Sequence, residues 1–117
     1  MKFELPLKIE SVANKREHWS EKSKRTKHHR QQACFMTPAR ATVPCIVTMT
    51  RIGPRELDDD NLASAFKAVR DGIADKLGVN DNDKRIQWRY AQRKGKPKEY
   101  SAEIEIQSAA RELEKSA

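Results

Sequence analysis

Residues 43 to 49 read Val43-Pro44-Cys45-Ile46-Val47-Thr48-Met49. Apolar residues occupy both odd and even positions, and β-branched residues are frequent, which is typical of a strand buried on both faces. We therefore expect a core strand here. The segment Arg51 to Arg55 contains Gly53-Pro54, so we expect it to form a turn that leads into the acidic residues that follow.

An amphipathic helix is expected directly after the acidic cluster Asp58-Asp59-Asp60-Asn61. Its apolar residues recur at spacings of four, three, four and four, which is the stripe of one continuous helix. These residues are Leu62, Phe66, Val69, Ile73 and Leu77. Either Asp60 or Asn61 is suited to cap the N-terminus of this helix, and Gly78 is placed to end it.

Three further segments alternate apolar and polar residues, which is the period-two pattern of a strand. The first runs from Phe3 to Ile9, and Pro6 favours an edge position because proline has no backbone donor. The other two are Ile86 to Tyr90 and Tyr100 to Ile106. The turn-rich segment Arg93 to Lys98 connects them, so we predict that they form the two arms of a hairpin.

Length and composition favour a single basic domain. The chain has 117 residues, with 24 Lys and Arg against 17 Asp and Glu, a formal charge of +7 and an isoelectric point of about 9.6. We expect residues 1–117 to form one compact α+β domain, in which helices pack on a small mixed β-sheet. Residues 12–35 and 108–116 are expected to supply two further helices. The basic charge favours a polyanionic partner, either nucleic acid or an anionic membrane face.

Several other classes of protein do not fit the sequence. No apolar stretch approaches the ~20 residues that a membrane-spanning helix needs, and Met1 to Ile9 lacks the apolar segment of a signal peptide. We therefore expect a cytoplasmic protein without a membrane partner. Cys34 and Cys45 match neither a C-x-x-C pair nor a zinc pattern, so we expect two reduced thiols that are buried or half-buried.

Asp58 and Asp60 are candidate ligands of a hard metal ion. In an extended segment, residues two apart point to the same side, so both carboxylates would face one ion while Asp59 points away. Mg²⁺ is typically held by one or two carboxylates, with waters and a substrate phosphate as its other ligands. Lys67 lies about two helical turns beyond Asp60 on nearly the same face, where it can pair with these carboxylates or bind the phosphate.

Taken singly, these features also have ordinary structural explanations. Acidic residues are favoured at helix starts by the helix dipole, and Asp81-Asn82-Asp83 has the composition of a common turn. A calcium loop starting at Asp81 is not expected, because Ile86 and Gln92 stand where such a loop has Gly and Glu.

Three motifs in order resemble the RusA family of Holliday junction resolvases. The motifs are Asp58-Asp59-Asp60-Asn61-Leu62, Lys67-Ala68-Val69-Arg70-Asp71-Gly72-Ile73 and Leu77-Gly78-Val79-Asn80-Asp81-Asn82-Asp83. In that family a D-x-D-N-L segment ends a strand, a K-A-x-x-D helix follows, and a G-[VF]-x-x-D-D loop closes the site. The resemblance covers roughly residues 43–92. It implies a Mg²⁺-dependent homodimer, with Mn²⁺ able to substitute, that resolves four-way DNA junctions by paired nicks in recombination and repair; many members are encoded by phages.

By position, the resemblance assigns metal-binding and catalytic roles to Asp58, Asp60 and Asp83, and the essential lysine to Lys67. This chain has about one helical turn more before the lysine, so Ser64 occupies the place where the family lysine is expected. Asn82 stands where the family often has the first Asp of its pair, which makes Asp81 a further candidate metal ligand. The N-terminal strand also lacks the family's P-P-S-x-N type segment, which bears on dimer contacts and junction binding.

Basic residues on either side of these motifs are expected to bind DNA phosphates. They are Lys15, Arg16, Lys22, Lys24, Arg25, Lys27, Arg30, Arg85, Arg93, Lys94, Lys96 and Lys98. Trp19, Trp88 and Tyr90 are suited to stack on unpaired bases, although Trp88 and Tyr90 also fit the core face of a strand. The three histidines, His18, His28 and His29, are expected on the surface.

The sequence therefore predicts a Mg²⁺-dependent endonuclease for branched DNA. One alternative is a catalytically silent branched-DNA-binding protein with the same fold. Another is an unrelated RNA-binding module, although that alternative leaves the acidic clusters unexplained.

Overall fold

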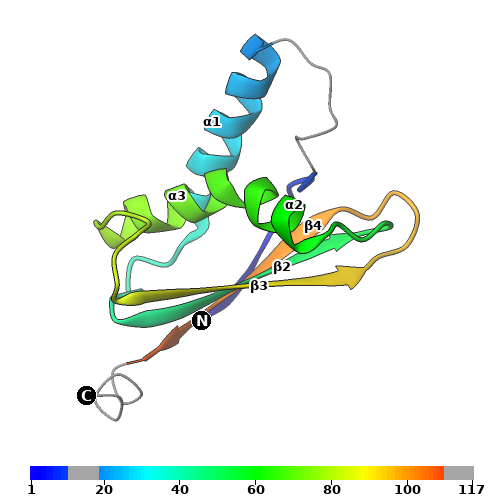
Figure 1. The fold of residues 1–117 in the computed structure, drawn as a ribbon. Helices are drawn as coiled ribbons and strands as arrows, with labels where there is room; N and C mark the ends of the chain where they lie inside the picture. Colours follow the sequence, from blue (N-terminus) through cyan, green and yellow to red (C-terminus); the bar gives the residue numbers. More distant parts are fainter. Residues whose placement is uncertain (11–18, 110–117) are drawn as a thin grey trace.

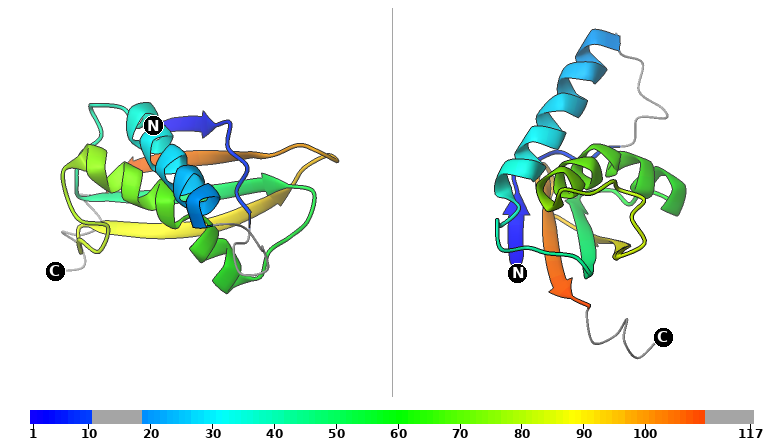
Figure 2. Two further views of the ribbon diagram at one scale, coloured as in Figure 1. Left: turned by 90° about the horizontal axis from the view of Figure 1, so that it is seen from above. Right: turned by 90° about the vertical axis from the view of Figure 1, so that its left-hand side faces the viewer.

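A computed structural model describes residues 1–10 and 19–109 of the chain. The elements are β1 (Lys2–Leu5), α1 (Trp19–Met36), β2 (Cys45–Gly53), α2 (Asp59–Ala65), α3 (Lys67–Leu77), β3 (Ile86–Lys94) and β4 (Ser101–Ser108). The four strands form one sheet, and the three helices lie over one of its faces (Figures 1 and 2). The expected terminal helix lies outside the described residues except for its first two positions, where Ser108 ends β4.

The sheet is mixed, with the strand order β1-β4-β2-β3. β2 runs parallel to β3 and antiparallel to β4, and β4 runs antiparallel to β1. The predicted α+β class is therefore confirmed. β1 lies at the edge of the sheet as Pro6 indicated, but it ends at Leu5, because Pro6 cannot continue the backbone pairing. Leu7 and Ile9 remain buried beyond the end of the strand.

β2 is an interior strand of the sheet, as its sequence predicted. Val47 and Met49 are fully buried, and β2 pairs with a neighbour on each side. The strand is longer than expected and continues to Gly53, so the predicted turn at Arg51 to Arg55 was placed too early. Arg51 is itself buried, and its Nε donates a hydrogen bond to the carbonyl of Ile9 at 2.7 Å.

The predicted hairpin is wrong. β3 and β4 do not pair with each other, because β2 lies between them: Met49 is opposite Tyr90 on one side and Ile104 on the other. An alternating pattern identifies a strand but not its neighbour. β2, with its two apolar faces, takes an interior place between β3 and β4, and residues 95–100 connect these two strands.

The predicted helix from Leu62 to Leu77 is divided in two at Phe66. Phe66 has φ −90° and ψ 0°, and it is both the C-cap of α2 and the N-cap of α3. Its side chain is fully buried and joins Leu62, Val69 and Ile73 in the core. Gly78 ends α3 with a φ of 73°, as predicted, because glycine adopts this left-handed conformation without strain.

α1 packs across α3 at a point of close approach. A Cβ added at Gly72 of α3 would lie 2.2 Å from the Arg30 carbonyl oxygen and 2.8 Å from the Ala33 Cβ. Ala33 and His29 are the buried residues of α1, so the prediction that His29 lies on the surface is wrong. The N-terminal half of α1 stands away from the sheet (Figure 1). The expected helix start at residues 12–18, including His18, lies outside the described residues.

The remaining predictions about side-chain burial agree with the structure. Cys45 is buried and Cys34 half-buried, and both are free thiols. Trp88 and Tyr90 pack against the core, whereas Trp19 is 75% exposed. Among residues 1–10 and 19–109, no helix combines the length and the apolar character needed to cross a membrane.

Candidate active site

Asp58 caps the N-terminus of α2, in place of the predicted Asp60 or Asn61. Its Oδ1 accepts a hydrogen bond from the backbone N–H of Asn61 at 2.9 Å. Asp59 and Asp60 already belong to the first helical turn, so the predicted extended geometry with Asp58 and Asp60 on one side is wrong. All three carboxylates are exposed, and no cation of the described residues forms an ion pair with them.

Two side chains hold the loop that leads to Asp58. The Gln92 amide makes two hydrogen bonds with the backbone of Leu57, at 2.9 and 2.7 Å. The Arg51 guanidinium donates to the carbonyl of Arg55. The approach to α2 is therefore attached to β3 and β2. Neither contact can be expected from the sequence, because both depend on which strand lies beside the loop.

Lys67 begins α3, and its ammonium joins two carboxylates. Nζ lies 2.7 Å from Asp81 Oδ2 and 2.9 Å from Asp71 Oδ1. The hydrogen bonds to Asp81 and Asp71 raise the pKa of Lys67, which stays charged. Lys67 was expected on the same helical face as Asp60, but the break at Phe66 separates the two helices that carry these residues.

Asp81 is held in a network that extends into β3. Its backbone carbonyl accepts hydrogen bonds from Arg70 Nη2 at 2.9 Å and from Trp88 Nε1 at 2.8 Å. The Arg70 guanidinium lies 4.8 Å from the centre of the Trp88 ring, and its Nη1 donates to the Tyr90 hydroxyl at 3.0 Å. The Lys67 hydrogen bond lowers the pKa of Asp81. Arg70 lies in the second motif, where no role was predicted for it.

Asp83 is turned toward Arg85. Its Oδ1 accepts from Arg85 Nε at 3.0 Å and from the Arg85 backbone N–H at 2.9 Å, and its Oδ2 accepts from Arg85 Nη2 at 2.8 Å. The Arg85 hydrogen bonds lower the pKa of Asp83 to about 2. Arg85 was expected to bind DNA, but its guanidinium is engaged by a carboxylate here.

A shallow depression brings part of the predicted site together. It is lined by Ala63, Ser64, Lys67, Arg70, Asp81 and Tyr90. Asp60 lies one helical turn before Ser64, and residues four apart are neighbours on a helix surface. Asp58 and Asp83 do not line this depression. The structure therefore joins Ser64, Lys67 and Asp81, with Asp60 on the adjoining helical turn.

The predicted set of four metal ligands is not assembled. Within the described part of the chain, no group of three or more His, Cys, Asp or Glu side chains could hold a metal ion. Asp81 and Asp83 are each occupied by a cationic side chain. Asp58 and Asp60 fit Mg²⁺ in their donor chemistry, because this ion takes one or two carboxylate oxygens from a protein.

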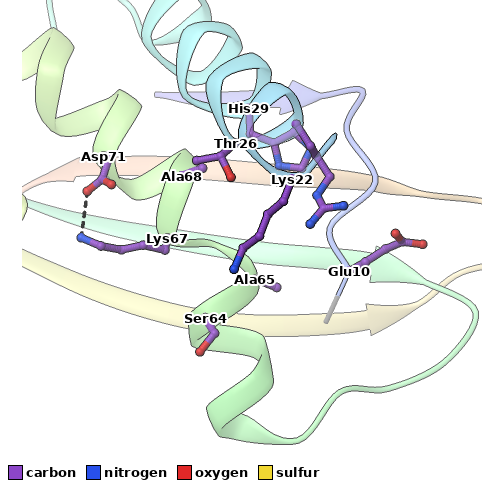
Figure 3. Close-up of a pocket in the computed structure, with 10 residues that line it drawn as sticks. Glu10, Lys22, Thr26, His29, Ser64, Ala65, Lys67, Ala68 and Asp71 are labelled. Carbon is purple, nitrogen blue, oxygen red and sulfur yellow. Dashed lines mark hydrogen bonds and ion pairs between the residues drawn. The ribbon is translucent and has the colours of Figure 1, made fainter. Parts of the chain in front are cut away.

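A second concavity, which we call the interhelical cleft, separates α1 from the junction of α2 and α3 (Figure 3). α1 contributes Lys22, Arg25, Thr26 and His29; α2 and α3 contribute Ser64, Ala65, Lys67, Ala68 and Asp71; and Glu10 completes the lining. The Lys22 side chain reaches toward Ala65, whereas the Lys67 ammonium is turned toward Asp71. Burial lowers the pKa of His29 to about 4, so His29 is neutral at pH 7.

The basic residues expected to bind DNA differ in their availability. Arg30 donates from Nε to Asp75 Oδ2 at 2.7 Å and from Nη2 to Asp75 Oδ1 at 2.9 Å. Arg93 donates from Nη2 to Glu103 Oε1 at 2.9 Å. Lys24 lies 3.9 Å from Glu21. The other exposed lysines of this set are Lys22 and Lys27 on α1, and Lys94, Lys96 and Lys98 at the end of β3 and after it. Lys15 and Arg16 lie outside the described residues.

No protein-family model matches this chain. An uncharacterized protein of Xylella fastidiosa (strain Temecula1 / ATCC 700964) is 36% identical over an alignment of 81 positions, which covers 58% of this chain and 51% of that protein. The chain thus spans about half the length of this relative.

Proposed function

We propose that this protein is a Mg²⁺-dependent, structure-selective endodeoxyribonuclease of the RusA type, which resolves four-way DNA junctions. The observation that carries the proposal is the 2.7 Å contact between Lys67 and Asp81. It joins the second and third motifs in space, beside the helix that starts with the first motif. A homodimer is part of the proposal, because two symmetric nicks require two equivalent sites.

The residues of the site have distinct roles in this proposal. Asp58 and Asp60 would hold the metal ion, and Asp81 and Asp83 would be further ligands if their cationic partners moved to DNA phosphates. When bound, Mg²⁺ supplies a water nucleophile at neutral pH and stabilises the leaving oxygen. The Lys67 ammonium binds an oxygen of the scissile phosphate and balances its developing charge. Ser64 lines the same depression and donates a hydrogen bond to that phosphate.

A catalytically silent junction-binding protein is the second candidate function. The ion pairs of Asp81 with Lys67 and of Asp83 with Arg85 favour it, because they leave both carboxylates neutralised without a metal ion. Such a protein would retain the basic surface and bind branched DNA without cutting it.

The two functions are separated by incubating a labelled four-way junction and a matched linear duplex with Mg²⁺ or with EDTA. The nuclease proposal expects paired nicks that are confined to the junction and that disappear in EDTA. Asp60→Asn should abolish cleavage and retain junction binding, and Asp59→Asn is the matched control, because it removes the neighbouring exposed carboxylate.

Two results would overturn the proposal of a nuclease. Junction binding without nicks would indicate the silent binder. Undiminished cleavage by Asp60→Asn would remove the proposed site.

A further inference from the structure

α1 is an unusual helix for a small domain. It has 18 residues but buries only His29 and Ala33 among them. It carries five Lys or Arg against one acidic residue, Glu21. Its N-terminal half extends away from the sheet (Figures 1 and 2), and Lys22, Lys24 and Lys27 are exposed. A helix that is polar all round and strongly basic is complementary to a polyanion.

An aromatic side chain stands among these charges. Trp19 is 75% exposed at the start of α1. It lines a shallow, open concavity on one face of α1 together with Lys22, Ser23, Thr26, Lys27 and Arg30, which we call the α1 groove. Proteins that bind single-stranded nucleic acid combine a cationic groove with aromatic side chains, on which bases stack.

The α1 groove continues into the candidate active site through shared residues. Lys22 and Thr26 line both the α1 groove and the interhelical cleft. Ser64 and Lys67 line both the interhelical cleft and the depression that contains Asp81. The three concavities therefore follow one another from Trp19 to Asp81. Figure 3 shows the middle of this path, where Lys22 reaches from α1 toward α2.

The two carboxylates that border the cleft are each paired with a lysine. Glu10 Oε1 lies 2.8 Å from Lys8 Nζ, and Asp71 Oδ1 lies 2.9 Å from Lys67 Nζ. Lys22 and Arg25 add positive charge to the same cleft, and the hydroxyl groups of Thr26 and Ser64 add neutral donors. Because the carboxylates are balanced in this way, the cleft can accept a phosphate group.

We infer that the α1 groove and the interhelical cleft form a binding path for an unpaired DNA strand. Trp19 stacks on a base, and Lys22 binds a backbone phosphate on the way to Lys67. The inference rests on the proposed function only in taking DNA as the partner. It adds that the protein binds a strand with unpaired bases at the branch. In a continuous duplex, base stacking covers the faces on which Trp19 would stack.

Binding in EDTA tests this inference without cleavage. The probes are a short labelled oligothymidylate, the equivalent oligouridylate and a duplex of the same length. Trp19→Ala should weaken oligothymidylate binding by about tenfold and leave duplex binding nearly unchanged. Phe35→Ala is the matched control, because Phe35 is 79% exposed on the same helix but lies outside the α1 groove. Thermal unfolding of each variant checks that the fold is retained.

The phosphate contact is tested by the salt dependence of oligothymidylate binding. The logarithm of the binding constant falls as the logarithm of the salt concentration rises. Loss of one phosphate contact makes this slope less steep by about 0.7 for a single strand. Lys22→Ala should show this change, whereas Lys24→Ala, on the same helix but outside both concavities, should not.

Three results would overturn the inference: unchanged oligothymidylate binding by Trp19→Ala, an equal loss with Phe35→Ala, or tighter binding of oligouridylate than of oligothymidylate. None of these results depends on cleavage. A protein that cuts junctions can fail this test, and one that never cuts can pass it.

Discussion

The side-chain amide of Gln92 pairs with the backbone of Leu57 as a neighbouring strand would. The Leu57 N–H donates to Gln92 Oε1 at 2.9 Å, and Gln92 Nε2 donates to the Leu57 carbonyl at 2.7 Å. Gln92 belongs to β3, the edge strand beside β2, and Leu57 directly precedes Asp58. Both polar groups of one residue are therefore fixed immediately before the N-cap of α2.

Replacing Gln92 by Glu should disturb Asp58 while keeping the size of the side chain. A carboxylate can accept from the Leu57 N–H, but it cannot donate to the Leu57 carbonyl and faces that oxygen unfavourably. We expect a loss of about 1 kcal/mol in the free energy of unfolding. In the proposed nuclease we also expect a severalfold higher Mg²⁺ concentration for half-maximal cleavage.

The control for this change is Gln87→Glu, since Gln87 is an exposed residue of the same strand. Urea unfolding and cleavage at graded Mg²⁺ concentrations measure the two effects. A Gln92→Glu protein with the stability and the Mg²⁺ dependence of the unchanged chain would show that this contact does not position Asp58.

Arg85 competes with any metal ion for Asp83, because it holds both carboxylate oxygens. Removing the guanidinium in Arg85→Ala should raise the pKa of Asp83 from about 2 toward its ordinary value and leave the carboxylate open to solvent. If Asp83 is a metal ligand, the DNA-free protein should then bind Mn²⁺ severalfold more tightly. Titration with MnCl₂ followed by electron paramagnetic resonance measures this affinity.

Arg89→Ala is the charge-matched control for Arg85, since Arg89 is an exposed arginine of β3. An equal gain in Mn²⁺ affinity by Arg89→Ala would mean that the overall charge of the protein controls this affinity, and not the release of Asp83 from Arg85. Unchanged Mn²⁺ binding by Arg85→Ala would remove Asp83 from the proposed ligand set.

The parts of the fold that local sequence determines were predicted correctly. The two-faced apolar pattern identified β2 as a core strand, and Gly78 marked the end of α3. The helix break at Phe66 could not be predicted from the apolar stripe. Phe66 continues that stripe and its side chain stays in the core, although its backbone leaves the helix. Strand neighbours were also hidden, since an alternating pattern is the same whichever strand lies beside it.

The candidate site was only partly predictable for the same reason. Lys67 and Asp81 belong to separate motifs, and their contact depends on how α3 and the following loop approach each other. Gln92 is 35 residues away from Leu57 in the chain, so no local pattern reveals that pairing. Arg85 is only two residues from Asp83, and this ion pair could have been suspected from the sequence.

Gly72→Ala should destabilise the protein although alanine favours a helix. A methyl group at this position would meet the Arg30 carbonyl oxygen at 2.2 Å and the Ala33 Cβ at 2.8 Å, so α1 must move away from α3. Overpacking costs about 1 to 3 kcal/mol, and a 2.2 Å approach to a backbone oxygen places this site above the lower end of that range, so the cost exceeds the roughly 1 kcal/mol gained in helix propensity.

Urea unfolding of the Gly72→Ala protein measures this balance. Gly78→Ala is a useful comparison, because no atom lies within 4 Å of its added Cβ and its cost arises from the φ of 73° alone. A Gly72→Ala protein more stable than the unchanged chain would contradict the close packing of α1 on α3.

His29 should make the stability of the fold sensitive to mild acid. Burial first, and then the nearby His28 and Arg25, lower its pKa from 6.5 to about 4, while Glu10 acts in the opposite direction. The folded protein thus keeps His29 neutral at pH values where the unfolded chain already takes up a proton. The contribution of His29 to the free energy of unfolding should therefore be fully present above about pH 6.5. It should fall as the pH drops toward 4, by up to about 3 kcal/mol.

The carboxylates with lowered pKa values act at lower pH, so they do not obscure this effect. Asp75, Asp81 and Asp83 lose their stabilising contributions only below the ordinary carboxylate pKa of 3.8. Urea unfolding at pH 7.5, 6 and 5 should show the loss in the unchanged protein and in His28→Gln, whose ring is exposed. His29→Gln should be less stable at pH 7.5 but nearly independent of pH over this range. If His29→Gln kept the full pH dependence, the titrating group would lie elsewhere in the chain.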